Sequence, residues 1–191
     1  QSAHFDTFSR IPPDKYAYAL NTLLPPDIRV RSSRLVPGDF HARFSSTGKA
    51  YRYLMYQSPH AGALNRNTHW HVIYPLEDDL MRREARELLG RHDFAAFASS
   101  GSSVKDTVRE IYRADLTRTG DEIRLDIEGK GFLYNMVRII AGTLALVGAG
   151  KLESGAIRRG IETRNRLELG VTAPAHGLTL MEVFYPETVD K

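Results

Sequence analysis

The stretch Phe132-Leu-Tyr-Asn-Met-Val-Arg138-Ile-Ile-Ala-Gly-Thr-Leu-Ala-Leu-Val-Gly-Ala-Gly150 decides how this chain folds. Apolar residues recur in it at helical spacing, at Met136, Ile139, Ile140, Leu144 and Val147. The opposite face carries Arg138 together with Tyr134, Ala141, Gly142 and Ala145. A helix that is apolar or small on every side is a buried helix, and the stretch predicts one.

Arg138 is the only charged residue of this stretch. A guanidinium group keeps its proton inside a protein, so a buried arginine needs an anionic partner. The small residues one turn further on would let another segment of backbone come close. The sequence therefore predicts a buried cationic site that receives a carboxylate or a phosphate.

Two other interpretations of this arginine stay open at this point. It could form a structural ion pair with an acid such as Asp93 or Asp126, because ion-pair networks also occur without chemistry. A membrane span fits less well. The stretch contains an arginine, an asparagine and three glycines, whereas a span needs about 20 continuous apolar residues.

The composition is that of an ordinary globular protein of one large or two small domains, with 191 residues and 26% charged residues. The chain has no cysteine, which excludes disulfides and thiolate metal sites and agrees with a cytoplasmic protein. No stretch reads as a signal peptide. The net charge of +3 is too small to establish a nucleic-acid partner by itself.

The rest of the chain alternates between helical and strand patterns. Helices are expected over 12–24, from Asp78 or Asp79 to near Gly90, and over 155–162. Strands are expected over 28–36, 49–56, 69–74, 107–119, 122–128 and 178–185, with 107–128 forming a hairpin around Gly120. The polar loop Ser99–Ser103 is expected to be flexible and able to contact a ligand. This order predicts an α+β fold, a mainly antiparallel sheet with helices packed on one side.

One strand combines aromatic rings with cations, since Tyr51 and Tyr53 alternate with Lys49 and Arg52. Unstacked RNA bases pack on such rings while the cations hold phosphates. The alternative is a half-buried strand, in which tyrosine is simply common.

No metal site is predicted. His69 and His71 lie on one side of a strand, but the sequence offers no third ligand nearby, so a structural or surface role is favoured. The histidines and acids form no catalytic triad, and no glycine-rich phosphate loop of standard spacing occurs.

Six ordered blocks of the sequence resemble the tRNA pseudouridine synthase A family. They begin at Phe40, Lys49, Asp93, Thr107, Gly131 and Gly177. The sharpest is Phe-Leu-x-x-Met-Val-Arg, which ends at Arg138, and the resemblance runs from the first residues to about Pro186.

The resemblance implies a pseudouridine synthase-like fold and an isomerase that converts uridine to pseudouridine in the anticodon arm of tRNA, at positions 38 to 40. It implies no cofactor and no metal, and a homodimer that binds the anticodon stem-loop. Tyr51 would pack on the target base, Arg138 would pair with a catalytic aspartate, and Gly177 and Leu178 would form the pocket edge. Arg43, Lys49 and Arg109 are candidate phosphate contacts.

The family's catalytic aspartate belongs to a Gly-Arg-Thr-Asp-x-Gly-Val-His-Ala block that these 191 residues do not contain. Because Gln1 to Asp6 match the family's residues immediately after that block, residues 1–191 are expected to be the C-terminal catalytic-domain portion, without the natural N-terminal region. The chain alone is therefore expected to be inactive, and Arg138 without its partner would cost about 3–5 kcal/mol of stability.

Two further hypotheses remain. The chain could be an RNA-binding module without chemistry of its own, or a structural α+β domain whose arginine forms only an internal ion pair.

Overall fold

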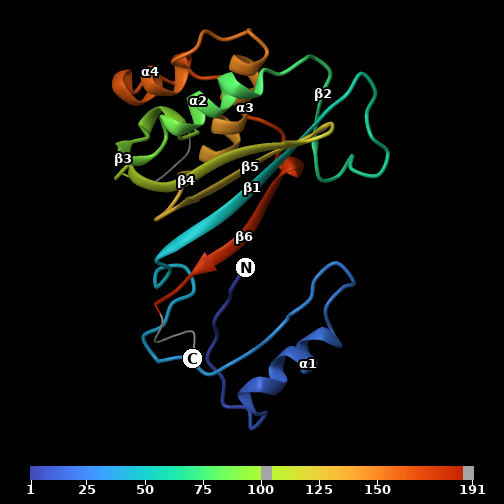
Figure 1. Cartoon of the computed structure of the whole chain (residues 1–191). Helices are drawn as coiled ribbons and strands as arrows, with labels where there is room; N and C mark the ends of the chain where they lie inside the picture. The colour runs from blue at the N-terminus through green and yellow to red at the C-terminus, as the bar shows by residue number, and fades with distance from the viewer. Residues whose placement is uncertain (100–104, 187–191) are drawn as a thin grey trace. The chain divides into compact units, whose positions relative to one another are not determined.

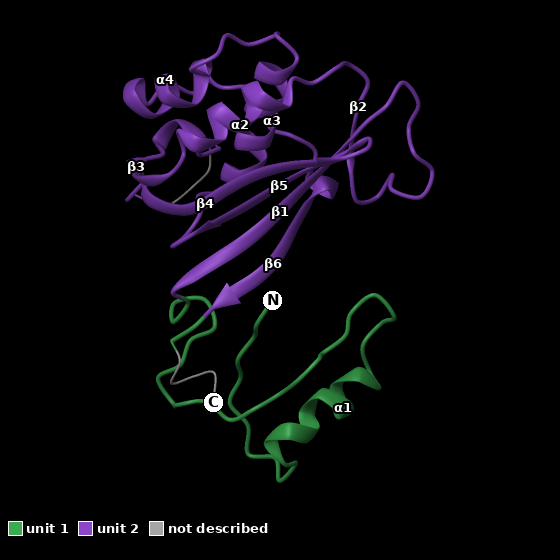
Figure 2. Ribbon diagram, viewed as in Figure 1, with its two compact units in different colours: residues 1–46, 185–191 green, residues 47–184 purple. Residues whose placement is uncertain are grey.

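The computed structural model describes residues 1–99 and 105–186. The chain separates into two compact units, of which the first comprises residues 1–46 with the chain end from Tyr185, and the second Thr47–Phe184 (Figures 1 and 2). The predicted loop Ser99–Ser103 lies outside the described residues apart from Ser99.

Within its described residues, 1–46 and 185–186, the first unit contains one short α-helix, a 3-10 turn and otherwise irregular chain. A 3-10 turn, η1 (Pro13–Lys15), leads into α1 (Tyr16–Asn21). The helix is shorter than the predicted 12–24, because the 3-10 turn takes its first residues and the chain after Asn21 forms a turn in which the Leu23 and Leu24 N–H groups both donate to the Leu20 carbonyl oxygen.

The strand predicted over 28–36 is wrong. The Asn21 amide group donates to the Val30 carbonyl oxygen at 2.8 Å and accepts from the Val30 N–H at 2.8 Å. Both backbone groups of Val30 are therefore paired by a side chain instead of a neighbouring strand, and residues 28–36 form no strand.

A six-stranded, mainly antiparallel sheet forms the second unit (Figure 1). The central strand β1 pairs along one edge with β5, which continues to β4 and β3. Its other edge is shared by β2, which runs parallel to it, and β6, which runs antiparallel. The strands are β1 (Gly48–Gln57), β2 (Trp70–Val72), β3 (Gly90–Asp93), β4 (Val108–Thr119), β5 (Glu122–Gly129) and β6 (Leu178–Phe184).

Three helices cover one face of this sheet, as predicted (Figure 1). They are α2 (Asp78–Arg86), α3 (Met136–Gly148) and α4 (Ala156–Thr163). Every residue of α3 except Arg138 and Leu146 is buried, which confirms the predicted buried helix. The small-residue prediction is also confirmed, because a Cβ added at Gly142 would lie 1.9 Å from the Val171 carbonyl oxygen.

The predicted helix from Asp78 is too long, and strand β3 was not expected. The helix ends at Arg86, and Gly90 takes a φ of +95°, which suits glycine and turns the chain into β3. The β3 sequence Gly-Arg-His-Asp carries no apolar alternation, so only its backbone pairing with β4 makes it a strand.

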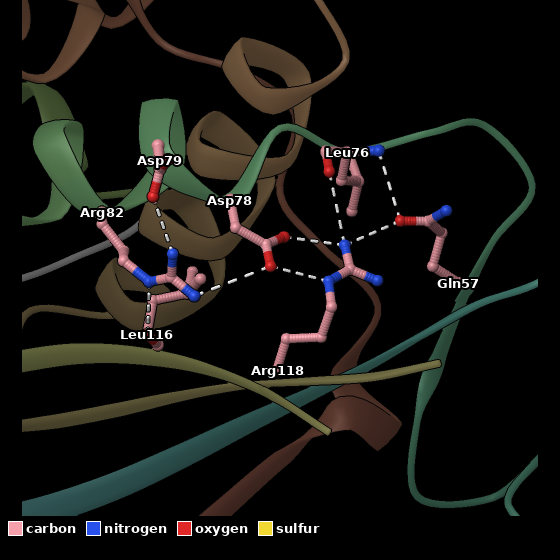
Figure 3. Close-up of polar contacts among 7 residues, drawn as sticks. All are labelled: Gln57, Leu76, Asp78, Asp79, Arg82, Leu116 and Arg118. Atoms are coloured by element: carbon pink, nitrogen blue, oxygen red, sulfur yellow. Dashed lines mark hydrogen bonds and ion pairs between the residues drawn. The ribbon is translucent and has the colours of Figure 1, made fainter. Parts of the chain in front are cut away.

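An arginine fastens the start of α2 to strand β4 (Figure 3). The Arg118 Nε and Nη2 atoms each donate to an Asp78 carboxylate oxygen at 2.7 Å, and Nη2 also donates to Gln57 Oε1 at 2.8 Å. The Asp78 carboxylate also lies at the N-terminus of the helix, where a negative charge is favoured.

Within the described residues, no helix is both long and apolar enough to cross a membrane. Even the buried α3 has 13 residues, short of the roughly 20 that a span requires.

Candidate functional site

Arg138 is held by two neutral acceptors. Its Nε donates to the Ala173 carbonyl oxygen at 2.7 Å, and its Nη1 donates to Asn135 Oδ1 at 2.9 Å. The side chain is half-buried rather than sealed from solvent, so the prediction of a fully buried cation is corrected on this point.

The acids proposed as structural partners of Arg138 bind other groups. Asp93 lies 3.0 Å from Arg164 and accepts from Thr107, and these contacts, with the Thr107 hydroxyl first, lower the pKa of its carboxyl group. Asp126 lies 2.7 Å from Arg52 and 2.9 Å from Arg124. Across residues 1–99 and 105–186, no carboxylate forms an ion pair with Arg138. The ion-pair interpretation with either acid is therefore wrong.

Asn135 precedes α3 in a left-handed backbone conformation, with φ 62° and ψ 6°. Its amide oxygen accepts from Arg138, and its amide nitrogen donates to Ser99 Oγ at 3.0 Å. Asparagine is one of the few residues that visit this conformation readily. Sequence analysis missed this residue, although an asparagine directly before a predicted helix was a signal for it.

Tyr51 and Tyr53 project from the helix-covered face of β1 but have different surroundings. Tyr51 is half-buried and packs edge-on against Phe132, with 5.1 Å between ring centroids. Tyr53 is fully buried, and its hydroxyl donates to the Pro174 carbonyl oxygen at 2.7 Å. Of the pair, only Tyr51 keeps part of its ring accessible for stacking, and Tyr53 is a core residue.

Burial raises the pKa of both phenols above the ordinary value of 10.0. At Tyr53 the nearby positive charge of Arg138 opposes this effect without reversing it. Both tyrosines therefore keep their protons at neutral pH, and Tyr51 offers a neutral hydroxyl beside its partly open ring.

Gly177 and Leu178 lie against the same tyrosine. Leu178 is the register partner of Tyr53 at the start of β6. A Cβ at Gly177 would lie 2.7 Å from Tyr53 Cζ and 2.9 Å from the Leu54 carbonyl oxygen, so only glycine fits there. The segment from Ala173 to Leu178 thus contacts both Arg138 and Tyr53.

The three candidate phosphate contacts differ in their surroundings. Arg43 belongs to the first unit, is exposed, and lies 5.6 Å over the Phe44 ring. Lys49 is a half-buried residue of β1. Arg109 in β4 donates from Nη1 to the backbone oxygens of Asp106 and Val108, at 3.0 and 2.5 Å.

The histidines His69 and His71 bind protein atoms. His69 Nε2 lies 2.9 Å from Glu122 Oε2, and His71 Nε2 lies 2.8 Å from the Ser58 carbonyl oxygen. The described part of the chain contains no group of three or more histidines, cysteines or acids able to hold a metal ion.

Comparison with known proteins gives consistent matches. Residues 85–186 match the sequence family described as tRNA pseudouridine synthase. The tRNA pseudouridine synthase A of Ruminiclostridium cellulolyticum is 50% identical over 186 residues, which cover 97% of this chain and 76% of that protein. The proteins of the same name from Acetivibrio thermocellus and Bacillus subtilis are 50% and 45% identical over 185 residues, which cover 76% and 75% of their lengths.

Proposed function

This chain belongs to the tRNA pseudouridine synthase A family, and from that premise we propose that it isomerises uridine to pseudouridine in the anticodon arm of tRNA. The expected positions are 38 to 40. The proposal rests on one observation in particular: Arg138 is a half-buried cation with only neutral hydrogen-bond acceptors among the described residues.

The missing partner of Arg138 is, in this proposal, the catalytic aspartate of the family. A guanidinium fork matches a carboxylate geometrically and would keep it ionised and oriented. The block that carries this aspartate in the family does not occur in these 191 residues, so the chain would act as the C-terminal portion of the catalytic domain and would be inactive alone. Asn135 and Ala173 fix the guanidinium before the carboxylate arrives.

The reaction breaks the bond between uracil N1 and the ribose C1′ carbon, rotates the base and forms a bond from C5 to C1′. Positive character develops on the sugar carbon, and the aspartate stabilises or traps it. The C5 proton leaves and N1 gains one, so the step balances without a cofactor or a metal. Extrusion of the base from its stack costs a few kcal/mol, and stacking on the accessible ring of Tyr51 returns about 1–3 kcal/mol.

The surrounding residues take supporting roles in this proposal. Gly177 and Leu178 form the edge of the uridine pocket, and Tyr51 provides a neutral hydroxyl that helps proton movement. Arg43, Lys49 and Arg109 contact phosphates of the anticodon stem-loop. The active protein is a homodimer and works in the cytoplasm, where its tRNA substrate is found.

The test uses the chain joined to the segment that carries the aspartate block in its relatives. Pseudouridine formed in an anticodon-arm transcript is measured by nucleoside chromatography for the parent protein, Tyr51→Ala and Tyr51→Phe. Tyr112→Ala is the matched control, since Tyr112 is an exposed tyrosine of β4. Loss of one stacking contact predicts a decrease of about 5- to 150-fold in kcat/KM for Tyr51→Ala.

A slow Tyr51→Phe variant with unchanged RNA affinity would support the proton role of the hydroxyl. Parent-level activity in Tyr51→Ala would overturn the assigned stacking role. RNA binding by the parent without any pseudouridine would leave the non-catalytic RNA-binding module as the better description.

A further inference from the structure

A pocket lies at the edge of the sheet, apart from the contacts that hold Arg138. It has a volume of about 330 Å³, and six residues that line it are Tyr56, Asn65, Arg66, Trp70, His71 and His176. This volume falls at the lower end of the roughly 300–1,000 Å³ that small-molecule sites occupy, so the pocket suits one nucleoside-sized group.

The strand topology creates the pocket. Trp70, the first residue of β2, pairs with Met55, and Leu178, the first residue of β6, pairs with Tyr53. The two strands therefore begin side by side on one edge of β1, and the chain that precedes each one leaves the sheet there. His176 Nε2 lies 2.9 Å from the His69 carbonyl oxygen and ties the two entering segments together.

Aromatic side chains provide flat surfaces in this pocket. Tyr56 and His71 are register partners, so their rings project from the same face of the sheet, with 6.5 Å between centroids. Trp70 also lines the pocket, although its indole projects from the other face of the sheet, as its register partner Met55 does, and packs edge-on against Tyr53, with 6.4 Å between centroids. Such rings bind unpaired bases, because every base has a face that stacks.

The loop that precedes β2 adds polar groups that can bind the edge of a base and a phosphate. Asn65 contributes an amide, which can both donate to and accept from the edge of a base. Arg66 is exposed, and its Nη1 donates to the Ala63 carbonyl oxygen at 2.8 Å, which fixes the side chain while leaving guanidinium donors for a phosphate. The pocket thus combines aromatic rings on which a base can stack, an amide that can bond the edge of the base, and a guanidinium for a phosphate.

We propose that this pocket holds one unpaired nucleotide of the RNA strand, separate from the uridine that reacts. The proposal takes RNA as the ligand from the proposed function. The contacts that connect the two sites run from the Trp70 ring to Tyr53, from the Tyr53 hydroxyl to the Pro174 carbonyl oxygen, and from the adjacent Ala173 to Arg138. A nucleotide seated here would therefore help to set the register in which the strand enters the uridine site.

The chain itself offers the readout, because Trp70 is its only tryptophan. A base that enters the pocket should quench the fluorescence of Trp70, and titration with a single-stranded oligouridylate of five nucleotides measures the affinity. Arg66→Gln should weaken binding about 3- to 10-fold and lower the salt slope of log K by about 0.7, the value for one phosphate contact on a single strand. Arg83→Gln, an exposed arginine of α2 changed in the same way, should bind as the parent does.

Three outcomes would overturn the proposal. Quenching that is unchanged in Arg66→Gln would show that the strand does not use the pocket. Quenching that is lost in Tyr51→Ala would assign the signal to the uridine site instead. Equal affinity for uridine 5′-monophosphate and the oligouridylate would identify a free nucleotide, not an RNA strand, as the ligand.

This experiment is independent of catalysis. Arg66-dependent quenching in a protein that carries the aspartate block but forms no pseudouridine would support the pocket and reject the proposed function. Pseudouridine formation with quenching that does not depend on Arg66 would support the proposed function and reject the pocket.

Discussion

Arg138 and Ala173 are joined by two hydrogen bonds that run in opposite directions. The Arg138 side chain donates from Nε to the Ala173 carbonyl oxygen at 2.7 Å, and the Ala173 N–H donates to the Arg138 carbonyl oxygen at 3.1 Å. The chain beyond α4 is thereby fixed to α3 at the residue that carries the charge. The guanidinium is positioned by backbone, which no side-chain substitution at position 173 removes.

Asn135 completes this arrangement, and its loss should affect catalysis more than stability. Asn135→Gly keeps the left-handed conformation without strain but removes the acceptor for Arg138 Nη1 and the donor to Ser99. In the protein that carries the aspartate, we expect kcat to fall about tenfold or more, since a mispositioned charge loses transition-state stabilisation. Thermal unfolding of the same variant should stay near that of the parent, and a parent-level kcat would contradict the positioning role.

Gly142→Ala should destabilise the fold through a backbone clash. The added Cβ would lie 1.9 Å from the Val171 carbonyl oxygen, and a backbone atom cannot rotate away as a side chain can. Overpacking of this kind costs about 1–3 kcal/mol, which lowers Tm by several degrees in a chain of this size. Gly131→Ala is the matched control, because its Cβ would meet atoms no closer than 3.6 Å. Equal melting temperatures for both variants would contradict the close packing.

The clamp between Arg118 and Asp78 should contribute more than a surface ion pair (Figure 3). Their side chains are 24% and 18% exposed, and removal of the arginine leaves a largely buried carboxylate with only the longer ion pair to Arg82, at 3.6 Å. We expect Arg118→Ala to lower the free energy of unfolding by about 2 kcal/mol in urea titrations. Arg158→Ala removes a bidentate bridge to Glu87 whose side chains are 62% and 34% exposed, and it should cost below about 1 kcal/mol. Equal losses in the two variants would show that burial does not strengthen the clamp.

The buried phenol of Tyr53 should make the fold sensitive to alkali. Its pKa in the folded state is raised by burial, whereas in the unfolded chain it ionises near 10. Below pH 10 the Tyr53 phenol is protonated in both the folded and the unfolded chain, and its full contribution to the free energy of unfolding is present. Above it the unfolded state ionises first, and stability declines until the folded pKa is passed. Tyr53→Phe should therefore lose less stability than the parent between about pH 8 and pH 11, and identical losses would contradict the assignment.

The elements that sequence analysis predicted correctly are those whose apolar residues repeat regularly. The stretch around Arg138 and the hairpin of β4 and β5 have clear periods, and each occupies the predicted place in the α+β fold. Strand β3 was not predicted, because its side chains show no apolar alternation and only backbone pairing with β4 makes it a strand. The segment 28–36 alternates like a strand, but it pairs with no other strand, and the side chain of Asn21 binds both backbone groups of Val30 in its middle.

The candidate site was predictable in its residue types but not in its contacts. A lone arginine in an apolar helix indicated a cation that needs a partner, and the described residues supply it with neutral acceptors only. Asn135 left only one local signal, an asparagine directly before the predicted helix, and Ala173 left none, because it lies 35 residues beyond Arg138 in the chain. Long-range backbone contacts leave no local pattern in a sequence.

The most direct test of the account is the rate of pseudouridine formation by Arg138→Ala in the protein that carries the aspartate block. Loss of the charge that we propose orients the nucleophile should lower kcat by about 100- to 1,000-fold, while Arg158→Ala keeps the parent rate. Arg138→Lys restores the charge without the fork and should recover only part of the loss. A parent-level kcat in Arg138→Ala would contradict the account at its centre.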